Sequence, residues 1–82
     1  MHEMSIATAI LDQAREEMER RQQKRLTRIG LRLGDLSGVD LNSLSFCFEV
    51  LVKDTDFEAV TLDVERTAKD DLAMTFLEFD DG

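Results

Sequence analysis

The spacing of apolar residues changes from a helical to an alternating pattern near residue 25, and this change dictates the order of the elements. Before it, apolar residues recur every three or four positions, which is the spacing of one buried helical face. The stripe consists of Met4, Ala7, Leu11, Ala14 and Met18, flanked by Ile6 and Ile10. The pattern predicts an amphipathic helix from Met4 to about Gln23.

The following segment alternates between apolar and polar positions from Thr27 to Leu33. One side carries Thr27, Ile29, Leu31 and Leu33, and the other carries Arg28, Gly30 and Arg32. Alternation of this kind is typical of a strand that is buried on one face. A turn is expected over residues 34–38, because this stretch holds two glycines, an aspartate and a serine.

A second helix is expected after this turn, with Asp40 as its N-cap residue. Leu44, Cys47, Phe48 and Leu51 would then share one face, and the polar stretch from Asp54 to Glu58 would end the helix. These apolar positions recur at the three- and four-residue spacing of a helix, so they would form a second buried stripe.

Two further strands complete the predicted order. Val60, Leu62 and Val64 alternate with polar residues, and a third strand from Leu72 to Phe79 follows the polar turn Thr67–Asp71. Leu72 and Met74 stand at even-numbered positions, whereas Leu77 and Phe79 stand at odd-numbered positions. In a regular strand the two pairs would therefore face opposite sides of the sheet. A bulge near Thr75-Phe76 would let all four face the core and would leave Phe76 outside.

The order helix, strand, helix, strand, strand predicts an α+β fold. The strand-helix-strand unit implies that the first two strands are parallel, so we expect a small mixed three-stranded sheet with both helices on one face. On the open face, Arg28 and Arg32 could form ion pairs with Asp63 and Glu65. A chain of 82 residues with these elements is expected to form a single domain, residues 1–82.

Charge and cysteine content narrow the class of function. The net charge of −8 disfavours nucleic acid and anionic membrane surfaces as partners. The single cysteine, Cys47, allows no internal disulfide, and its place on an apolar helical stripe favours packing over nucleophilic chemistry. No secretory signal or membrane-length apolar run is recognisable, so we expect a cytoplasmic protein. No catalytic triad signature or glycine-rich phosphate loop is recognisable either, so we expect no enzymatic activity.

The amino-terminal tripeptide Met1-His2-Glu3 contains the only histidine of the chain. If Met1 is the true amino terminus, its amine, the backbone nitrogen of His2 and the His2 Nδ1 can bind one ion, with the Glu3 backbone nitrogen as the next donor in reach. Nitrogen donors in a plane suit Ni(II) or Cu(II). The alternative is a solvated histidine in a mobile terminus, which is the commoner case for such a residue.

Several segments, in this order and spacing, resemble the amino-terminal domain of the HypA/HybF family of nickel-insertion factors for nickel–iron hydrogenase. They are Met1-His2-Glu3-Met4-Ser5-Ile6-Ala7, Leu31-Arg32-Leu33-Gly34, Leu36-Ser37-Gly38-Val39 and Leu44-Ser45-Phe46-Cys47-Phe48. The resemblance runs from Met1 to about Arg66 and resumes from Leu72 to Phe79.

The resemblance implies a nickel-binding accessory protein in which His2 is the principal ligand. The Met1 amine and the amides of His2 and Glu3 would be its companions. The Glu3 side chain and Asp40 could tune or orient the site, although helix capping is the more common role for an aspartate at such a position. The implied partners are a HypB-like GTPase and a hydrogenase large subunit.

One departure from the family pattern lies between about residues 66 and 72. Family members carry a zinc domain with two Cys-x-x-Cys pairs there, whereas this chain has only Thr67 to Asp71. We therefore expect no zinc, and the loss of any nickel ligand that the zinc domain supplies. A different class of function is then also open, namely a protein-interaction or dimerisation module that uses the open sheet face or Phe76.

Overall fold

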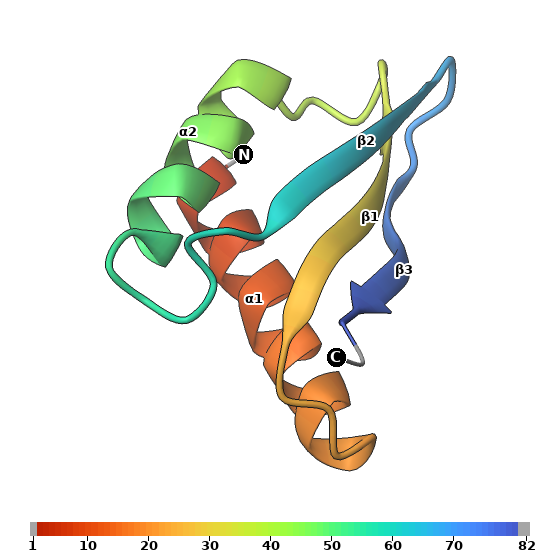
Figure 1. Ribbon diagram of the computed structural model, residues 1–82. Helices are drawn as coiled ribbons and strands as arrows, with labels where there is room; N and C mark the ends of the chain where they lie inside the picture. The colour runs from red at the N-terminus through yellow and green to blue at the C-terminus, as the bar shows by residue number, and fades with distance from the viewer. Residues whose placement is uncertain (1, 81–82) are drawn as a thin grey trace.

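The computed structural model describes residues 2–80 and has two helices and three strands (Figure 1). In chain order these are α1 (Glu3–Arg20), β1 (Leu26–Gly34), α2 (Leu41–Val52), β2 (Thr61–Thr67) and β3 (Leu72–Phe79). Both helices lie on the same side of the sheet (Figure 1). The predicted α+β order and the single helical layer are confirmed.

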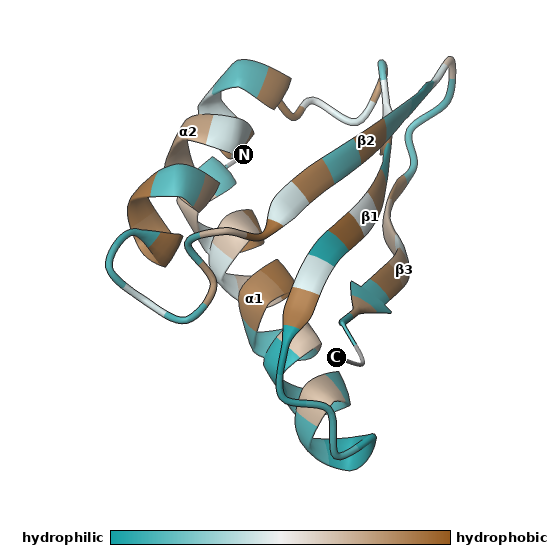
Figure 2. Cartoon of the chain, viewed as in Figure 1, coloured by the Kyte–Doolittle hydropathy of each residue, from teal (hydrophilic) through white to brown (hydrophobic). Residues whose placement is uncertain are grey.

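The sheet has the order β2-β1-β3, with β1 in the centre. β1 pairs in parallel with β2, as the strand-helix-strand unit predicted, and antiparallel with β3. Hydrophobic and polar residues alternate along β1 and β2 (Figure 2). The central position explains why Ile29, Leu31 and Leu33 of β1 are almost completely buried, because the helices cover them and strands flank them.

Helix α1 ends three residues earlier than the predicted end at Gln23. Gln22 has a φ of 56°, which is the left-handed conformation that terminates a helix. The N–H of Gln23 donates to the carbonyl of Met18 at 2.9 Å, and the N–H of Gln22 donates to that of Glu19 at 3.2 Å. These two bonds form a Schellman motif, which satisfies carbonyls at the end of the helix. The spacing of apolar residues does not indicate where such a motif ends a helix.

Among the described residues, the fully buried core comes from α1, β1, α2 and the loops on either side of α2, and neither β2 nor β3 contributes to it. Its buried members are Ala7, Ile10, Leu11, Ala14, Leu26, Ile29, Leu31, Leu33, Val39, Leu44, Phe48, Val52, Phe57 and Val60. The predicted apolar face of α2 is confirmed, with Cys47 and Leu51 packed at the edge of the core. That of α1 is confirmed from Ala7 onwards, but Met4 is 42% exposed, so the prediction that it lies on the buried stripe is wrong.

Thr27 does not face the core, contrary to the alternating pattern. The β1–β3 register is irregular between Leu26 and Arg28, so Leu26 takes the buried place and is 5% exposed. The hydroxyl of Thr27 donates instead to the Glu78 carbonyl at 3.0 Å. A bulge therefore lets an apolar side chain replace a polar one in the core.

The predicted bulge in β3 is confirmed at Thr75, because Phe76 pairs with Gly30 whereas Met74 pairs with Leu31. Phe76 lies outside the core, as predicted, and its ring covers Gly30. A Cβ added to Gly30 would lie 2.1 Å from that ring. The guanidinium of Arg28 lies 5.3 Å from the centroid of the Phe76 ring.

Leu72 lies on the helix side of the sheet, opposite α1, but the prediction that it belongs to the core is wrong, because this residue is 39% exposed. Met74, Leu77 and Phe79 do pack against the core, but only partly buried. A hollow of about 400 Å³ separates this edge strand from α1, and it is lined by Ile6, Ala9, Ile10, Gln13, Leu31, Leu72, Ala73 and Met74. The helices therefore do not close over β3.

The ion pairs predicted on the open face are present. Arg28 lies 3.5 Å from Asp63, and Arg32 lies 3.6 Å from Glu65. Arg28 also pairs with Glu78 on the other side at 3.2 Å. All of these side chains are well exposed, so each pair contributes at most about 1 kcal/mol.

The short connection between β2 and β3 crosses the end of β1. Its backbone is fixed there by three hydrogen bonds, from the N–H groups of Gly34, Asp35 and Leu36 to the carbonyls of Asp71, Thr67 and Lys69, at 2.7, 2.8 and 2.9 Å. A Cβ on Gly34 would lie only 2.0 Å from the Lys69 carbonyl oxygen. The chain thus requires glycine where the crossover meets the central strand.

Within residues 2–80, neither helix combines the length and the apolar character that crossing a membrane requires.

Candidate metal centre

His2 is the N-cap residue of α1 and has an extended backbone, with φ −94° and ψ 102°. Its carbonyl accepts the first bond of the helix, from the N–H of Ile6 at 3.2 Å. The His2 side chain is exposed to solvent and makes no capping hydrogen bond. The imidazole therefore stands free at the start of a rigid helix, while Met1, the other predicted donor residue, lies outside the described residues.

Glu3 is the first residue of α1, and its carboxylate is tied to α2. Oε2 of Glu3 accepts a hydrogen bond from the backbone N–H of Asp40 at 3.1 Å. This bond is the main reason why the pKa of Glu3 lies below its ordinary value, and the N–H of Glu3 itself adds to the effect. The contact holds the amino termini of the two helices side by side.

Asp40 occupies the N-cap position of α2, as predicted, but its side chain makes no capping bond to the helix backbone. The hydroxyl of Ser43 donates to Oδ2 of Asp40 at 2.8 Å, and this bond holds the pKa of Asp40 below its ordinary value. Asp40 therefore reaches the amino-terminal segment through its backbone N–H to Glu3. Its carboxylate is directed to its own helix.

Side chains alone do not build a metal site in the part of the chain that the structure describes. Among residues 2–80, no three His, Cys, Asp or Glu side chains come together around a possible ion position. Backbone nitrogens are the other donors that the start of α1 offers. The first N–H groups of a helix have no acceptor within the helix.

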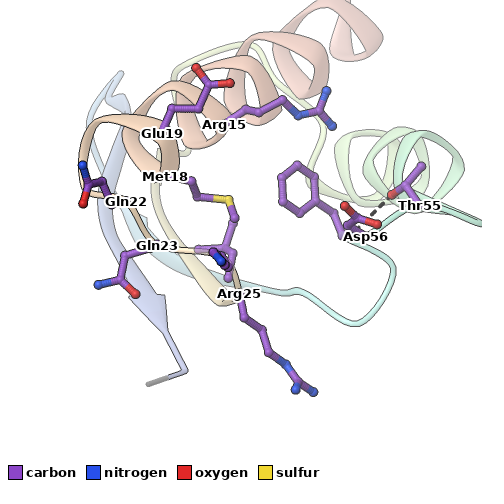
Figure 3. A pocket seen from close by; sticks show the side chains of 11 residues that line it. Arg15, Met18, Glu19, Gln22, Gln23, Arg25, Thr55 and Asp56 are labelled. Atoms are coloured by element: carbon purple, nitrogen blue, oxygen red, sulfur yellow. Dashed lines mark hydrogen bonds between the residues drawn. The ribbon is translucent and has the colours of Figure 1, made fainter. Parts of the chain in front are cut away.

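A hollow lies at the other end of α1 (Figure 3). It has a volume of about 810 Å³ and is lined by Arg15, Met18, Glu19, Gln22, Gln23, Lys24, Arg25, Leu26, Thr55, Asp56 and Phe57. Because α1 has 18 residues, this hollow is separated from Glu3 by most of a helix about 27 Å long. It is not part of the candidate metal centre.

No pattern in the sequence predicts this hollow. Its floor includes Phe57, which is 4% exposed, and the guanidinium of Arg15 lies 4.9 Å from the centroid of that ring. Arg15 and Phe57 are on α1 and on the loop after α2, so their contact depends on how the two helices pack. No periodic signal in either segment indicates it.

Residues 1–70 match the protein-family model described as "Hydrogenase/urease nickel incorporation, metallochaperone, hypA". The hydrogenase maturation factor HypA of Chlorobaculum parvum is 40% identical over 66 residues, which cover 80% of this chain and 58% of that protein. The corresponding factor of Aeromonas salmonicida is 38% identical over 68 residues, covering 83% and 60%. That of Prosthecochloris aestuarii is 42% identical over 62 residues, covering 76% and 55%.

The chain thus spans 55% to 60% of the length of these three curated relatives. A solved structure with a similar fold is the solution structure of the Ni metallochaperone HypA from Helicobacter pylori, with a TM-score of 0.78. It is 15% identical in sequence, and the superposition covers 96% of this chain and 97% of that one. At this identity the similarity establishes the fold alone.

Proposed function

The chain belongs to the HypA family, and from this premise we propose that it binds one Ni(II) ion at Met1-His2-Glu3 and passes it on during hydrogenase maturation. The observation that carries the proposal is the position of His2. Its imidazole is exposed, and its backbone lies immediately before the first turn of α1. The tripeptide also falls within the residues that match the family model.

The donor types suit the proposed cargo. An amine, an imidazole and a deprotonated amide are nitrogen donors that favour the planar geometry of Ni(II) and Cu(II). Each of these donors has to be free of its binding proton, so nickel binding releases protons and weakens on acidification. A carrier needs such a site, because nickel has to be released as well as held.

Helix α1 provides a rigid support for the tripeptide. Ala7 and Ile10, in its first turns, are 0% and 6% exposed and so anchor the helix on the sheet. The hydrogen bond from Asp40 to Glu3 fixes the helix end against α2. A donor set held on such an element keeps its position better than one on a free loop.

The partners and the missing domain belong to the same proposal. We propose a HypB-like GTPase and a hydrogenase large subunit as partners, by analogy with the family. We also propose that residues 1–82 form a single nickel-binding domain in which the zinc domain is absent between about 66 and 72. Its place is occupied by the crossover that hydrogen-bonds to Gly34, Asp35 and Leu36, and the one cysteine cannot build a four-cysteine site.

A second candidate function is the interaction or dimerisation module. Phe46 and Val50 favour it, because they follow each other by one turn on the outer side of α2 and are 65% and 49% exposed. Phe76 is a weaker anchor than predicted, since it already covers Gly30 and contacts Arg28. Size-exclusion chromatography with light scattering separates the two functions. Association without nickel that is lost in Phe46→Ser would favour the module.

The nickel proposal is tested by titration calorimetry at neutral pH on chain that begins with an unmodified Met1. His2→Ala and a chain extended before Met1 are each expected to lose stoichiometric nickel binding. Ser5→Ala, an exposed change in the same helical turn, serves as the matched control and is expected to bind as the parent does. Undiminished binding in both altered chains would rule out the proposed ligands.

A further inference from the structure

β2 is an edge strand whose outer backbone groups face no other strand of the described chain. The sheet order β2-β1-β3 leaves it a neighbouring strand on one side only (Figure 1). Its register with β1 runs without a break from Thr61 to Thr67. By contrast, the register of β3, the other edge strand, shifts in two places. Bulges blunt an edge, whereas a regular edge presents a row of N–H and C=O groups with which another strand can pair.

The two faces of this edge differ in chemistry. The open face carries the well-exposed carboxylates of Asp63 and Glu65. On the helix side, Leu62 and Val64 pack against the core but are only half-buried. A hollow of about 250 Å³ continues this apolar side towards α2, and it is lined by Ser45, Phe48, Glu49, Val60, Thr61 and Leu62. A strand added here would meet carboxylates on one face and apolar side chains on the other.

The surroundings of β2 are acidic. The segment 49–65 has a single lysine against six acidic residues, which are Glu49, Asp54, Asp56, Glu58, Asp63 and Glu65. Oδ2 of Asp63 lies 3.5 Å from Nη1 of Arg28, and Oε1 of Glu65 lies 3.6 Å from Nε of Arg32. A carboxylate can accept from more than one donor group, so these two contacts do not saturate it. The edge therefore favours an incoming chain with positive charge.

From the open edge and its charge we infer that β2 binds an extended basic segment of a partner protein, which becomes a fourth strand of the sheet. The segment alternates lysine or arginine with apolar residues. Its cations face Asp63 and Glu65, and its apolar side chains lie over Leu62 and the hollow beside α2. Backbone hydrogen bonds supply affinity, and the alternation supplies specificity. The interaction uses none of the donors of the amino-terminal tripeptide and does not require nickel.

A second copy of this chain does not suit the edge. Two sheets joined through β2 around a twofold axis perpendicular to the sheet would place the two strands antiparallel. A register that pairs most of the strand then brings Asp63 or Glu65 opposite one of the same carboxylates of the other copy. Like charges directly opposite each other destabilise a strand pair, and the net charge of −8 adds to the repulsion.

The probe for this inference is a fluorescently labelled heptapeptide of alternating lysine and valine, which matches the seven residues of β2. Its matched control has the same side chains and charge, but every internal amide is N-methylated, so it has no backbone donors for strand pairing. Fluorescence anisotropy with the parent chain at low salt should show at least about tenfold weaker binding of the control peptide. Equal binding of the two peptides, or no binding of the first, would overturn the inference.

A pair of double variants tests the location. Asp63→Asn with Glu65→Gln should weaken binding of the heptapeptide about fivefold or more. Asp12→Asn with Glu16→Gln, on the exposed side of α1, changes the net charge equally and should stay within about twofold of the parent. Far-UV circular dichroism checks that both fold, and the peptide comparison on the parent chain does not depend on them.

Hydrogen exchange of the backbone amides gives a separate readout. The heptapeptide should slow exchange in β2 and leave exchange in β3 unchanged, because only the β2 edge gains hydrogen bonds. Equal loss of binding in both double variants would reduce the interaction to general charge attraction and overturn the inference. A dimer of the parent chain with β2 amides protected in the absence of peptide would assign the edge to a second copy and overturn it as well.

Discussion

The backbone N–H of Asp40 donates to the Glu3 carboxylate at 3.1 Å, which ties the first residue of α1 to the N-cap residue of α2. The two residues are far apart in the sequence, yet the contact places both helix amino termini beside His2. The positive ends of two helix dipoles therefore lie close to a carboxylate. This arrangement stabilises the ionised form of Glu3 and makes the amino-terminal end of the fold sensitive to acid.

We expect part of the stability to be lost below about pH 4.5. The pKa values of Glu3, Glu17 and Asp40 lie below their ordinary values of 4.5, 4.5 and 3.8. A carboxyl group with a lowered folded-state pKa contributes stability above its unfolded pKa, and this contribution disappears as the pH falls through the folded value. Urea denaturation measured from about pH 3 to pH 7 should show this decline. In Glu3→Gln the decline should be shallower, and an identical pH profile would contradict the assignment.

Gly34 is expected to be less tolerant of substitution than Gly30. A Cβ at Gly34 would lie 2.0 Å from the Lys69 carbonyl oxygen, a backbone atom of the crossover that cannot move alone. At Gly30 the obstacle is the half-exposed ring of Phe76, which can turn away into solvent. Gly34→Ala should therefore lower the unfolding free energy by about 1–3 kcal/mol, and Gly30→Ala by less. Thermal denaturation of both variants measures the difference, and Phe76→Ala should relieve only the second.

Leu31 and Leu72 provide a matched test of where the core ends. Both are leucines facing the helices, but Leu31 is 1% exposed on the central strand and Leu72 is 39% exposed on the edge strand. Leu31→Ala should cost about 2–5 kcal/mol, which is the range for a fully buried leucine, and Leu72→Ala should cost well under half as much. Equal losses in chemical denaturation would mean that β3 is covered in solution.

Copper is expected to displace nickel from the tripeptide. The same nitrogen donors bind both ions, and Cu(II) stands above Ni(II) in the Irving–Williams order. Addition of one equivalent of Cu(II) to the nickel-loaded chain should release nickel, which a chromogenic chelator can detect. Retention of nickel under these conditions would indicate donors other than the proposed nitrogens.

The apolar stripe of α1 and the alternating pattern of β1 were sufficient to predict this helix and this strand, because each element buries one face and the spacing of its apolar residues follows that face. The end of α1 was not predictable to the residue, since the left-handed conformation of Gln22 depends on carbonyls at the helix end. The position of Leu72 was missed for a different reason. Leu72 is apolar and lies on the helix side of the sheet, as a core residue would, but the helices leave β3 partly uncovered.

The sequence alone determined the order of elements and most of the apolar faces of both helices, because these depend on local spacing. The nickel tripeptide is a proposal that rests on donor chemistry and on the family to which the chain belongs. Tertiary structure alone decided that β1 is central, that Glu3 meets Asp40 and that His2 is extended with a ψ of 102°. These features arise from contacts between segments that are distant in the chain. Local sequence patterns do not predict such contacts, because their free energy depends on how the whole chain packs.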